Sequence, residues 1–309
     1  MCAGLCHYGG WTVSSAPAYL NHPERFVEAG PYRTRYLEAG RLDRPTIVLV
    51  HDGAYGTDAE LCWQDVIREL AVDHRVLAPE LLGWGGTDKI VNFGRSRYEN
   101  QIAHLAAFCA ALGVEEADFV GTSFGGSVVV RAASEGSECR LPMRSVVSLS
   151  GTGGPYRCHD AVVALGEYVP SPEGAEAISR LIMQPAEPSR EHVERRYRVS
   201  LTHGHWEALK AQQVRRPGPA RRTGASGTAG SARYPATFAQ ARMPVLLVEG
   251  LADPINEPGW AHRLASYLPA AEVLHLESGH SPNLDRPAEV AAAIHAFRQR
   301  CSASPTGSG

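Results

Sequence analysis

A serine between glycines carries the strongest chemical signal in this sequence. The stretch Gly121-Thr122-Ser123-Phe124-Gly125 follows an apolar run and precedes residues that are typical of a helix. Small residues are needed on both sides where a strand turns sharply into a helix, and this turn leaves the serine Oγ exposed on strained backbone. The pattern therefore predicts that Ser123 is a nucleophile rather than a structural serine.

A serine hydroxyl becomes a good nucleophile only when a base removes its proton and an acid orients that base. Asp253 follows the apolar run VLLVEG, and His280 follows the run EVLHLE. If both runs are strands parallel to the one before Ser123, all three residues lie at the same edge of the sheet. Alone, Asp253 would be a turn residue and His280 a solvent-exposed histidine. Together with Ser123, they predict a catalytic triad.

The elements that would position these residues alternate along the chain. Short apolar, β-branched runs, which are typical of buried parallel strands, begin at about Pro45, Arg75, Asp118 and Ser145, and helical patterns lie between them. A hairpin around a Gly-Pro turn precedes them, and two further strands and helices follow residue 235. This rhythm predicts an α/β fold with a mostly parallel eight-stranded sheet and helices on both faces.

The chain divides into a core and one insertion. Residues 24–154 and 235–300 carry the α/β rhythm, whereas 155–234 is helical without matching strands. Because the insertion leaves after one strand and returns before the next, it is predicted to be a cap or lid over the strand ends. Within it, 215–233 is poor in apolar residues and is expected to be flexible. Residues 301–309 are expected to form a disordered tail.

Composition and charge exclude several classes of protein. The 309 residues are 44% hydrophobic with a net charge of −3, which is typical of a globular protein without a basic field for nucleic acid. No apolar run approaches the roughly 18 residues of a membrane helix, and the start of the chain lacks a secretory-signal pattern. We therefore expect a cytoplasmic protein that binds a small-molecule substrate without nucleic-acid or membrane partners, with a homodimer as one option for its assembly.

The cysteines give no sign of a metal site. The seven cysteines include no CxxC pair and have no histidine nearby at zinc-ligand spacing. Reduced thiols are expected, and neither a metal nor a cofactor is predicted.

Several stretches make the chain similar to the α/β-hydrolase superfamily between Val48 and Phe297. They are LVHDGAYG, APELLGWGGTD, VGTSFGG, LVEGLADPINEP and ESGHSPNLDRP. The order serine, aspartate, histidine is also that of this superfamily. Within it, the chain most resembles the group that contains the carbon–carbon hydrolases of meta-cleavage products, although Asp52 and Ser281 depart from the residues usual there. The resemblance implies an α/β-hydrolase fold with a helical lid.

An acyl-transfer site also needs N–H donors for a developing oxyanion. The elbow geometry makes the N–H of Phe124 one donor. The resemblance to the family loop implies that Gly53 supplies the second, with Ala54 as the next candidate. In the same loop His51 is expected to brace the backbone. Asp52 is expected to point away, because a carboxylate would oppose the negative charge of the oxyanion.

Aromatic residues near these loops are candidates for the wall of an apolar pocket, although aromatic residues lie in the core more often than not. Tyr55, Trp84 and Trp206 are assigned to the substrate pocket. Arg97, at the start of a helix, is expected on the surface instead. Asp88 is expected to be a structural hydrogen-bonding residue in its glycine-rich turn.

The sequence thus predicts a serine hydrolase that uses a Ser-His-Asp triad. Its substrate would be a small, mostly apolar carbonyl compound, with an ester, a lactone, a thioester or the carbon–carbon bond of a diketone as the scissile group. Two alternatives stay open: a same-fold enzyme that catalyses cyclisation, elimination or proton transfer, and a non-catalytic ligand-binding member. The intact triad argues against the second, and epoxide or haloalkane hydrolysis would require an aspartate at Ser123.

Overall fold

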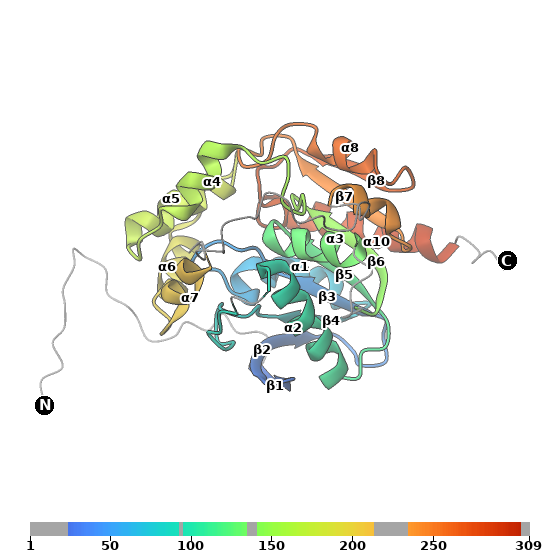
Figure 1. The fold of residues 1–309 in the computed structure, drawn as a ribbon, viewed down its shortest axis with the longest axis horizontal. Coiled ribbons are helices and arrows are strands. Elements are labelled where there is room, and N and C mark those ends of the chain that lie inside the picture. Colours follow the sequence, from blue (N-terminus) through green and yellow to red (C-terminus); the bar gives the residue numbers. More distant parts are fainter. Residues whose placement is uncertain (1–23, 93–94, 135–140, 213–233, 304–309) are drawn as a thin grey trace, which may run out of the picture.

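The structure is a computed structural model that describes residues 24–92, 95–134, 141–212 and 234–303. Its eight strands form one sheet in the order β1-β2-β4-β3-β5-β6-β7-β8 (Figure 1). The strands are β1 (Glu24–Ala29), β2 (Tyr32–Ala39), β3 (Thr46–Val50), β4 (Arg75–Pro79), β5 (Ala117–Thr122), β6 (Met143–Leu149), β7 (Val245–Gly250) and β8 (Glu272–Leu276). Strand β2 pairs antiparallel with β1 and β4, and all other pairs are parallel. This confirms the predicted mostly parallel eight-stranded sheet.

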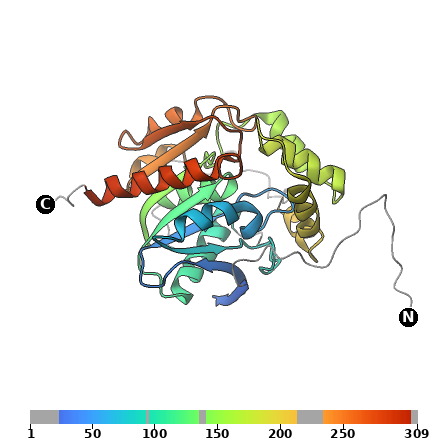
Figure 2. The same ribbon diagram turned by 180° about the vertical axis from the view of Figure 1, so that it is seen from behind.

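Helices cover both faces of the sheet (Figures 1 and 2). Because successive strand residues point to opposite faces, Val48 and Val50 enter one core cluster while Ile47 and Leu49 enter the other. The first cluster includes residues of α2 (Arg97–Ala111), α3 (Phe124–Ser134) and α8 (Trp260–Ala265). The second includes residues of α1 (Ala59–Leu70) and α10 (Pro287–Ala303). The central strands β3 to β7 are therefore largely buried on both sides, which explains their mostly apolar sequences, whereas the outer strand β1 is mostly exposed.

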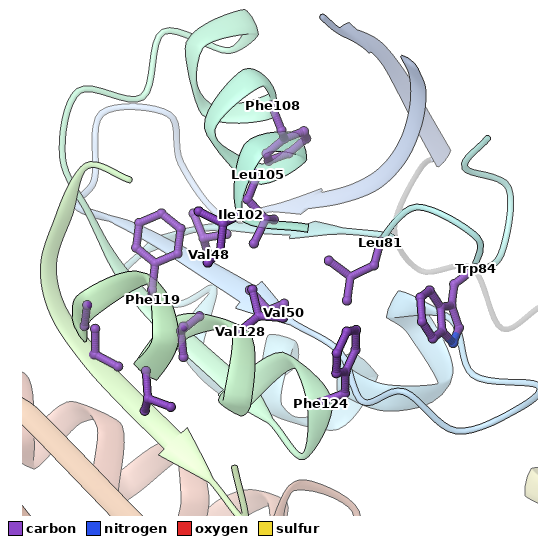
Figure 3. Packing of buried hydrophobic residues seen from close by; sticks show 14 of the residues in the cluster. Val48, Val50, Leu81, Trp84, Ile102, Leu105, Phe108, Phe119, Phe124 and Val128 are labelled. Carbon is purple, nitrogen blue, oxygen red and sulfur yellow. The ribbon is translucent and has the colours of Figure 1, made fainter. Parts of the chain in front are cut away.

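The first core cluster extends to the carboxyl end of the sheet, as Figure 3 shows. Val50 and Val128 lie between the deep core and Phe124 in this view. The rings of Phe124 and Trp84 stack with centroids 5.7 Å apart. The residue that follows Ser123 is thus anchored in the core, and this anchors the start of α3.

Caps fix where the helices beside this edge begin. The Asp58 side chain accepts the N–H of Leu61 at 2.6 Å at the start of α1. Ser96 and Glu99 form a capping box at the start of α2. These side chains satisfy N–H groups that have no partner within the helix, so the loops before them end at defined positions.

The insertion consists of helices that lie together beyond the end of the sheet formed by the carboxyl ends of the parallel strands (Figures 1 and 2). They are α4 (His159–Gly166), α5 (Pro172–Ile182), α6 (Arg190–Ser200) and α7 (His205–Ala211). A 3-10 helix (Ala236–Gln240) leads back to β7, and the short α9 (Pro282–Asp285) precedes α10. The segment 215–233, which the sequence predicts to be flexible, lies outside the described residues. In the part of the chain that is described, no helix combines the length and apolarity needed to cross a membrane.

The carboxyl-terminal end differs from the expectation of a tail from residue 301. Helix α10 continues to Ala303. Cys301 packs against the second core cluster, and the Ser302 hydroxyl donates to the carbonyl of Arg298 at 3.0 Å. These contacts carry the helix past the end of its apolar sequence pattern, and the rest of the predicted tail lies outside the described residues.

Candidate active site

Ser123 occupies a strained turn between β5 and α3. Its φ of +51° lies in the left-handed region that residues other than glycine rarely adopt. Its N–H donates to the carbonyl of Leu149 at 2.7 Å. A side chain on Gly125 would overlap the carbonyl of Val50, and one on Gly121 would overlap the backbone of Gly125. The two glycines therefore permit the close strand-to-helix turn that presents Ser123.

A row of hydrogen bonds joins the three residues that the sequence proposes as a triad. His280 Nε2 lies 2.7 Å from Ser123 Oγ, and His280 Nδ1 lies 2.9 Å from each carboxylate oxygen of Asp253. Each residue follows the carboxyl end of a different strand, β5, β7 or β8. With Nδ1–H donating to the carboxylate, Nε2 is left to accept the serine proton.

The carboxylate of Asp253 is held by its own loop. Oδ1 accepts the N–H groups of Ile255 at 2.8 Å and Asn256 at 3.2 Å, and Oδ2 accepts Nδ2–H of Asn256 at 2.9 Å. The same amide donates to the carbonyl of Ser150 at 2.8 Å. Burial raises the pKa of Asp253, but His280 and these hydrogen bonds outweigh it and hold that pKa below its usual value. The acid is therefore ionised at neutral pH.

The loop after β3 lies directly against the serine elbow. A side chain on Gly53 would come 2.7 Å from Cβ of Phe124. Neither the Gly53 N–H nor the Phe124 N–H donates to any described residue. The N–H of Ala54 instead donates to Oδ1 of Asp52 at 2.7 Å. Of these three N–H groups, only that of Ala54 is thus already bonded to another described residue.

A cavity of about 420 Å³ opens in front of Ser123 and His280. Tyr55 and Trp84, which the sequence assigns to the substrate pocket, are among the residues that line it. Trp206 does not, and this corrects the third assignment: its indole N–H donates to the carbonyl of Tyr168 at 3.3 Å. The apolar wall comes from other residues of the insertion, namely Val162, Val163, Leu165, Ile182 and Leu209.

A profile described as "Alpha/beta hydrolase family" matches residues 47–293, which include the serine, the aspartate and the histidine. The chain belongs to this family. Family membership also fits the fold and the strand-end positions described above. Membership of this family identifies the protein as a hydrolase.

Three proteins from species of Pseudomonas are similar to this alpha/beta hydrolase. The 2-hydroxy-6-oxo-2,4-heptadienoate hydrolase of Pseudomonas putida is 31% identical over 190 residues, which are 60% of this chain and 65% of that protein, just under two thirds of its length. The 2-hydroxymuconate semialdehyde hydrolase of Pseudomonas sp. strain CF600 is 26% identical over 92% of this chain and 97% of its own. The structure of meta-cleavage product hydrolase from Pseudomonas fluorescens IP01 shares the fold, with a TM-score of 0.75 and 21% identity over 89% of this chain and 97% of that one.

Side chains within the β3 loop of this alpha/beta hydrolase brace it in the way the sequence predicts. The second oxygen of Asp52 accepts the hydroxyl of Thr57 at 3.0 Å, so the carboxylate folds back into its own loop. His51 Nδ1 donates to the carbonyl of Asp52 at 2.6 Å, and Nε2 accepts the N–H of Leu81 at 2.9 Å. Burial lowers the pKa of His51, which keeps this ring neutral and able to accept.

Sequence reasoning missed two arginines of the cavity wall, Arg97 and Arg157. Arg97 is exposed, as expected, but its guanidinium also lies 4.7 Å from the ring centroid of Phe124. Burial and the positive charge of Arg97 lower the pKa of Arg157. Neither arginine forms an ion pair with a described residue. The position of Arg157 shortly after the carboxyl end of β6 is the one signal that could have indicated it.

Within residues 24–92, 95–134, 141–212 and 234–303, no three His, Cys, Asp or Glu side chains are grouped to bind a metal ion. The chemical groups gathered at the cavity are the serine, histidine and aspartate, the N–H groups of Gly53 and Phe124, and the two arginines.

Proposed function

We propose that this alpha/beta hydrolase cleaves a carbon–carbon bond of a small unsaturated oxo acid through an acyl-enzyme on Ser123. The observation that carries the proposal is the hydrogen-bonded row from Ser123 through His280 to Asp253 at the cavity. The curated relatives are named for a 6-oxo-dienoate and a muconate semialdehyde, which supports this substrate class.

In the first step, Ser123 Oγ bonds to the carbonyl carbon and its proton moves to His280 Nε2. Asp253 stabilises the resulting imidazolium because its carboxylate stays ionised. The carbonyl oxygen becomes an oxyanion, and the N–H groups of Gly53 and Phe124 are the donors that could receive it. These donors are fixed before the reaction, so they stabilise the transition state without rearrangement.

In the second step, the bond between the carbonyl carbon and its α-carbon breaks. The step requires the keto tautomer of the 2-hydroxy-dienoate, a vinylogous 1,5-diketone in which the hydroxyl proton has moved to this α-carbon. The electron pair of the broken bond passes into the conjugated keto group of this tautomer and gives a dienolate, and His280 gives its proton to that leaving fragment. Water then attacks the ester on Ser123 while His280 again takes a proton, and the carboxylic acid leaves. The net reaction adds one water and yields two products.

The two arginines give the cavity a cationic end. A carboxylate at Arg97 and Arg157 would form charge-assisted hydrogen bonds, the strongest kind available to a guanidinium. It would also offset the repulsion between two cations that lack a carboxylate partner among the described residues. We therefore propose that these arginines bind the carboxylate of the oxo acid.

We further propose that residues 155–234 act as the lid and that α4 is the part that closes on the substrate. None of the residues of α4 is buried, although Val162, Val163 and Leu165 line the cavity. Val162 and Val163 are 36% and 43% exposed. An apolar group of the substrate would remove these side chains from water, so its size and polarity would determine how well α4 closes.

The test is hydrolysis of 2-hydroxy-6-oxohepta-2,4-dienoate, followed by loss of dienolate absorbance and identification of the two products. We expect Ser123→Ala to lose on the order of 10³-fold or more in kcat. Ser134→Ala is the matched control, because this hydroxyl on the same helix donates to the carbonyl of Val130 and has no other hydrogen-bond partner among the described residues. Turnover of Ser123→Ala within a few-fold of the parent would overturn the acyl-enzyme. A product formed without uptake of water would favour the non-hydrolytic alternative.

A further inference from the structure

The oxyanion loop, defined as residues 51–58, is held on one side by the lid. Arg196 of α6 donates Nη1–H to the carbonyl of Tyr55 at 3.0 Å. His205 of α7 accepts the N–H of Gly56 at Nε2, also at 3.0 Å. Both side chains belong to residues that are 0% exposed. Two lid helices thus bond directly to the backbone two and three residues beyond Gly53.

The two side chains are chemically suited to hold the backbone of this loop. Arg196 donates Nε–H to the Ser179 hydroxyl at 3.0 Å and forms no ion pair with any described residue. A buried guanidinium without a carboxylate is energetically unfavourable, and burial lowers its pKa. Burial also lowers the pKa of His205 to about 3, so the ring is neutral and Nε2 can accept.

Packing presses the same turn of the loop against the lid. Gly56 has a φ of +69°, and a side chain there would overlap the carbonyl of Arg196. The ring of Tyr55 stacks on Tyr168 with centroids 4.9 Å apart. The lid therefore fixes the outer half of the loop, while Asp52 ties the inner half to itself.

We propose that Arg196 and His205 are positioning residues that hold the oxyanion loop so that the Gly53 N–H meets the developing oxyanion. The inference rests on the proposed acyl transfer at Ser123. A misplacement of about 1 Å in a catalytic group can reduce a rate about 10²-fold. The α6–α7 half of the lid is then a fixed part of the catalytic apparatus, and opening for substrate is left to α4.

Paired substitutions separate a positioning role from a merely structural one. His205→Leu removes the acceptor for the Gly56 N–H, whereas His205→Gln places Oε1 at about the same reach. Arg196→Met and Arg196→Lys form the second pair. Trp206→Phe is the control. It removes a hydrogen bond within the lid but leaves the bonds to the Tyr55 carbonyl and the Gly56 N–H in place.

The assays are hydrolysis of p-nitrophenyl butyrate and inhibition by a trifluoromethyl ketone, which forms a tetrahedral oxyanion on the serine. We expect kcat to fall about 10- to 100-fold in His205→Leu and in Arg196→Met. The affinity for the trifluoromethyl ketone should fall by a similar factor, whereas KM for the ester should change less than about threefold. The shape of the pH profile should not change, because the triad is untouched. His205→Gln should recover most of the loss, and Trp206→Phe should resemble the parent.

Hydrogen exchange of the peptide spanning 51–58 provides a readout that needs no turnover. Exchange should be faster in His205→Leu than in the parent, His205→Gln and Trp206→Phe. If the parent hydrolyses nothing but exchange changes in this way, the proposed function fails while the attachment of the loop to the lid stands. Folded His205→Leu with parental kcat and exchange would overturn the inference. An equal loss of kcat in His205→Leu and His205→Gln would also overturn it. So would a loss of the same size in the control Trp206→Phe. If Arg196→Met fails to fold, the His205 pair decides.

Discussion

A negative charge at position 256 would directly perturb Asp253, because the Asn256 side chain contacts its carboxylate. Nδ2 of Asn256 lies 2.9 Å from Asp253 Oδ2 and 2.8 Å from the carbonyl of Ser150, and Asn256 is 2% exposed. Asn256→Asp keeps the size of the side chain but replaces this donor with a second carboxylate facing the first. Asn256→Ala removes the same two hydrogen bonds without adding a charge.

The magnitude follows from the spacing. Two carboxylates about 4 Å apart repel by about 4 kcal/mol at an effective dielectric constant of 20, which corresponds to about three pKa units. The pair would take up one proton near neutral pH, and Asp253 would then no longer be a full anion beside His280. Asn256→Ala loses about 1 kcal/mol for each hydrogen bond and leaves the charge of Asp253 unchanged.

The assay is kcat for an ester substrate from pH 5 to 9 in both variants. The ratio of Asn256→Asp to Asn256→Ala activity should rise with pH, because the carboxylate pair loses its shared proton. The free energy of unfolding of Asn256→Asp relative to Asn256→Ala should fall as pH rises. A carboxyl whose pKa is raised in the folded state stabilises fully below its unfolded pKa, and this contribution is lost as pH rises through the folded value. Identical pH profiles for the two variants would refute the electrostatic role assigned to Asp253.

Three further predictions follow from the site and its supports. Arg157→Met should raise KM for the oxo acid about 10- to 100-fold, the loss of a charged hydrogen bond, while KM for a neutral p-nitrophenyl ester stays within a few-fold; equal effects on both substrates would contradict the carboxylate site. Gly125→Ala should reduce kcat at least about 100-fold, because the added methyl overlaps the carbonyl of Val50; a fully active variant would contradict the elbow geometry. Burial raises the pKa of Asp285 to about 6, so its stabilising contribution is present below about pH 4 and lost as pH rises through 6. Asp285→Asn should therefore gain Tm over the parent at pH 7 but not at pH 4 in thermal unfolding, and a pH-independent difference would contradict this.

The parts of the site that the sequence predicted depend on local patterns. Ser123 lies between glycines after an apolar strand, and Asp253 and His280 each follow another such strand. A buried strand is a short, contiguous signal, and parallel pairing brings the carboxyl ends to one edge. Position along the chain therefore translates directly into position in the site, and the sheet was predictable for the same reason.

The parts that the sequence did not predict depend on how helices α4 to α7 pack. Trp206 and Leu209 are both apolar residues of α7, and only the rotation of that helix against the core decides which of them reaches the cavity. Arg196 and His205 contact the oxyanion loop across 141 and 149 residues of sequence. No periodicity within α6 or α7 encodes such a partner. Polar residues within these helices were the available signal, and their partners are defined only in the folded chain.

The central claim is that Ser123 is the nucleophile, and a fluorophosphonate probe tests it most directly. We predict that the probe labels one site per chain, on the peptide that contains Ser123, and that activity falls in proportion to labelling. The oxo acid substrate should protect against the probe, and Ser123→Ala should not be labelled. Full labelling of Ser123 with undiminished turnover would contradict the claim, as would an active enzyme that the probe labels only at another residue.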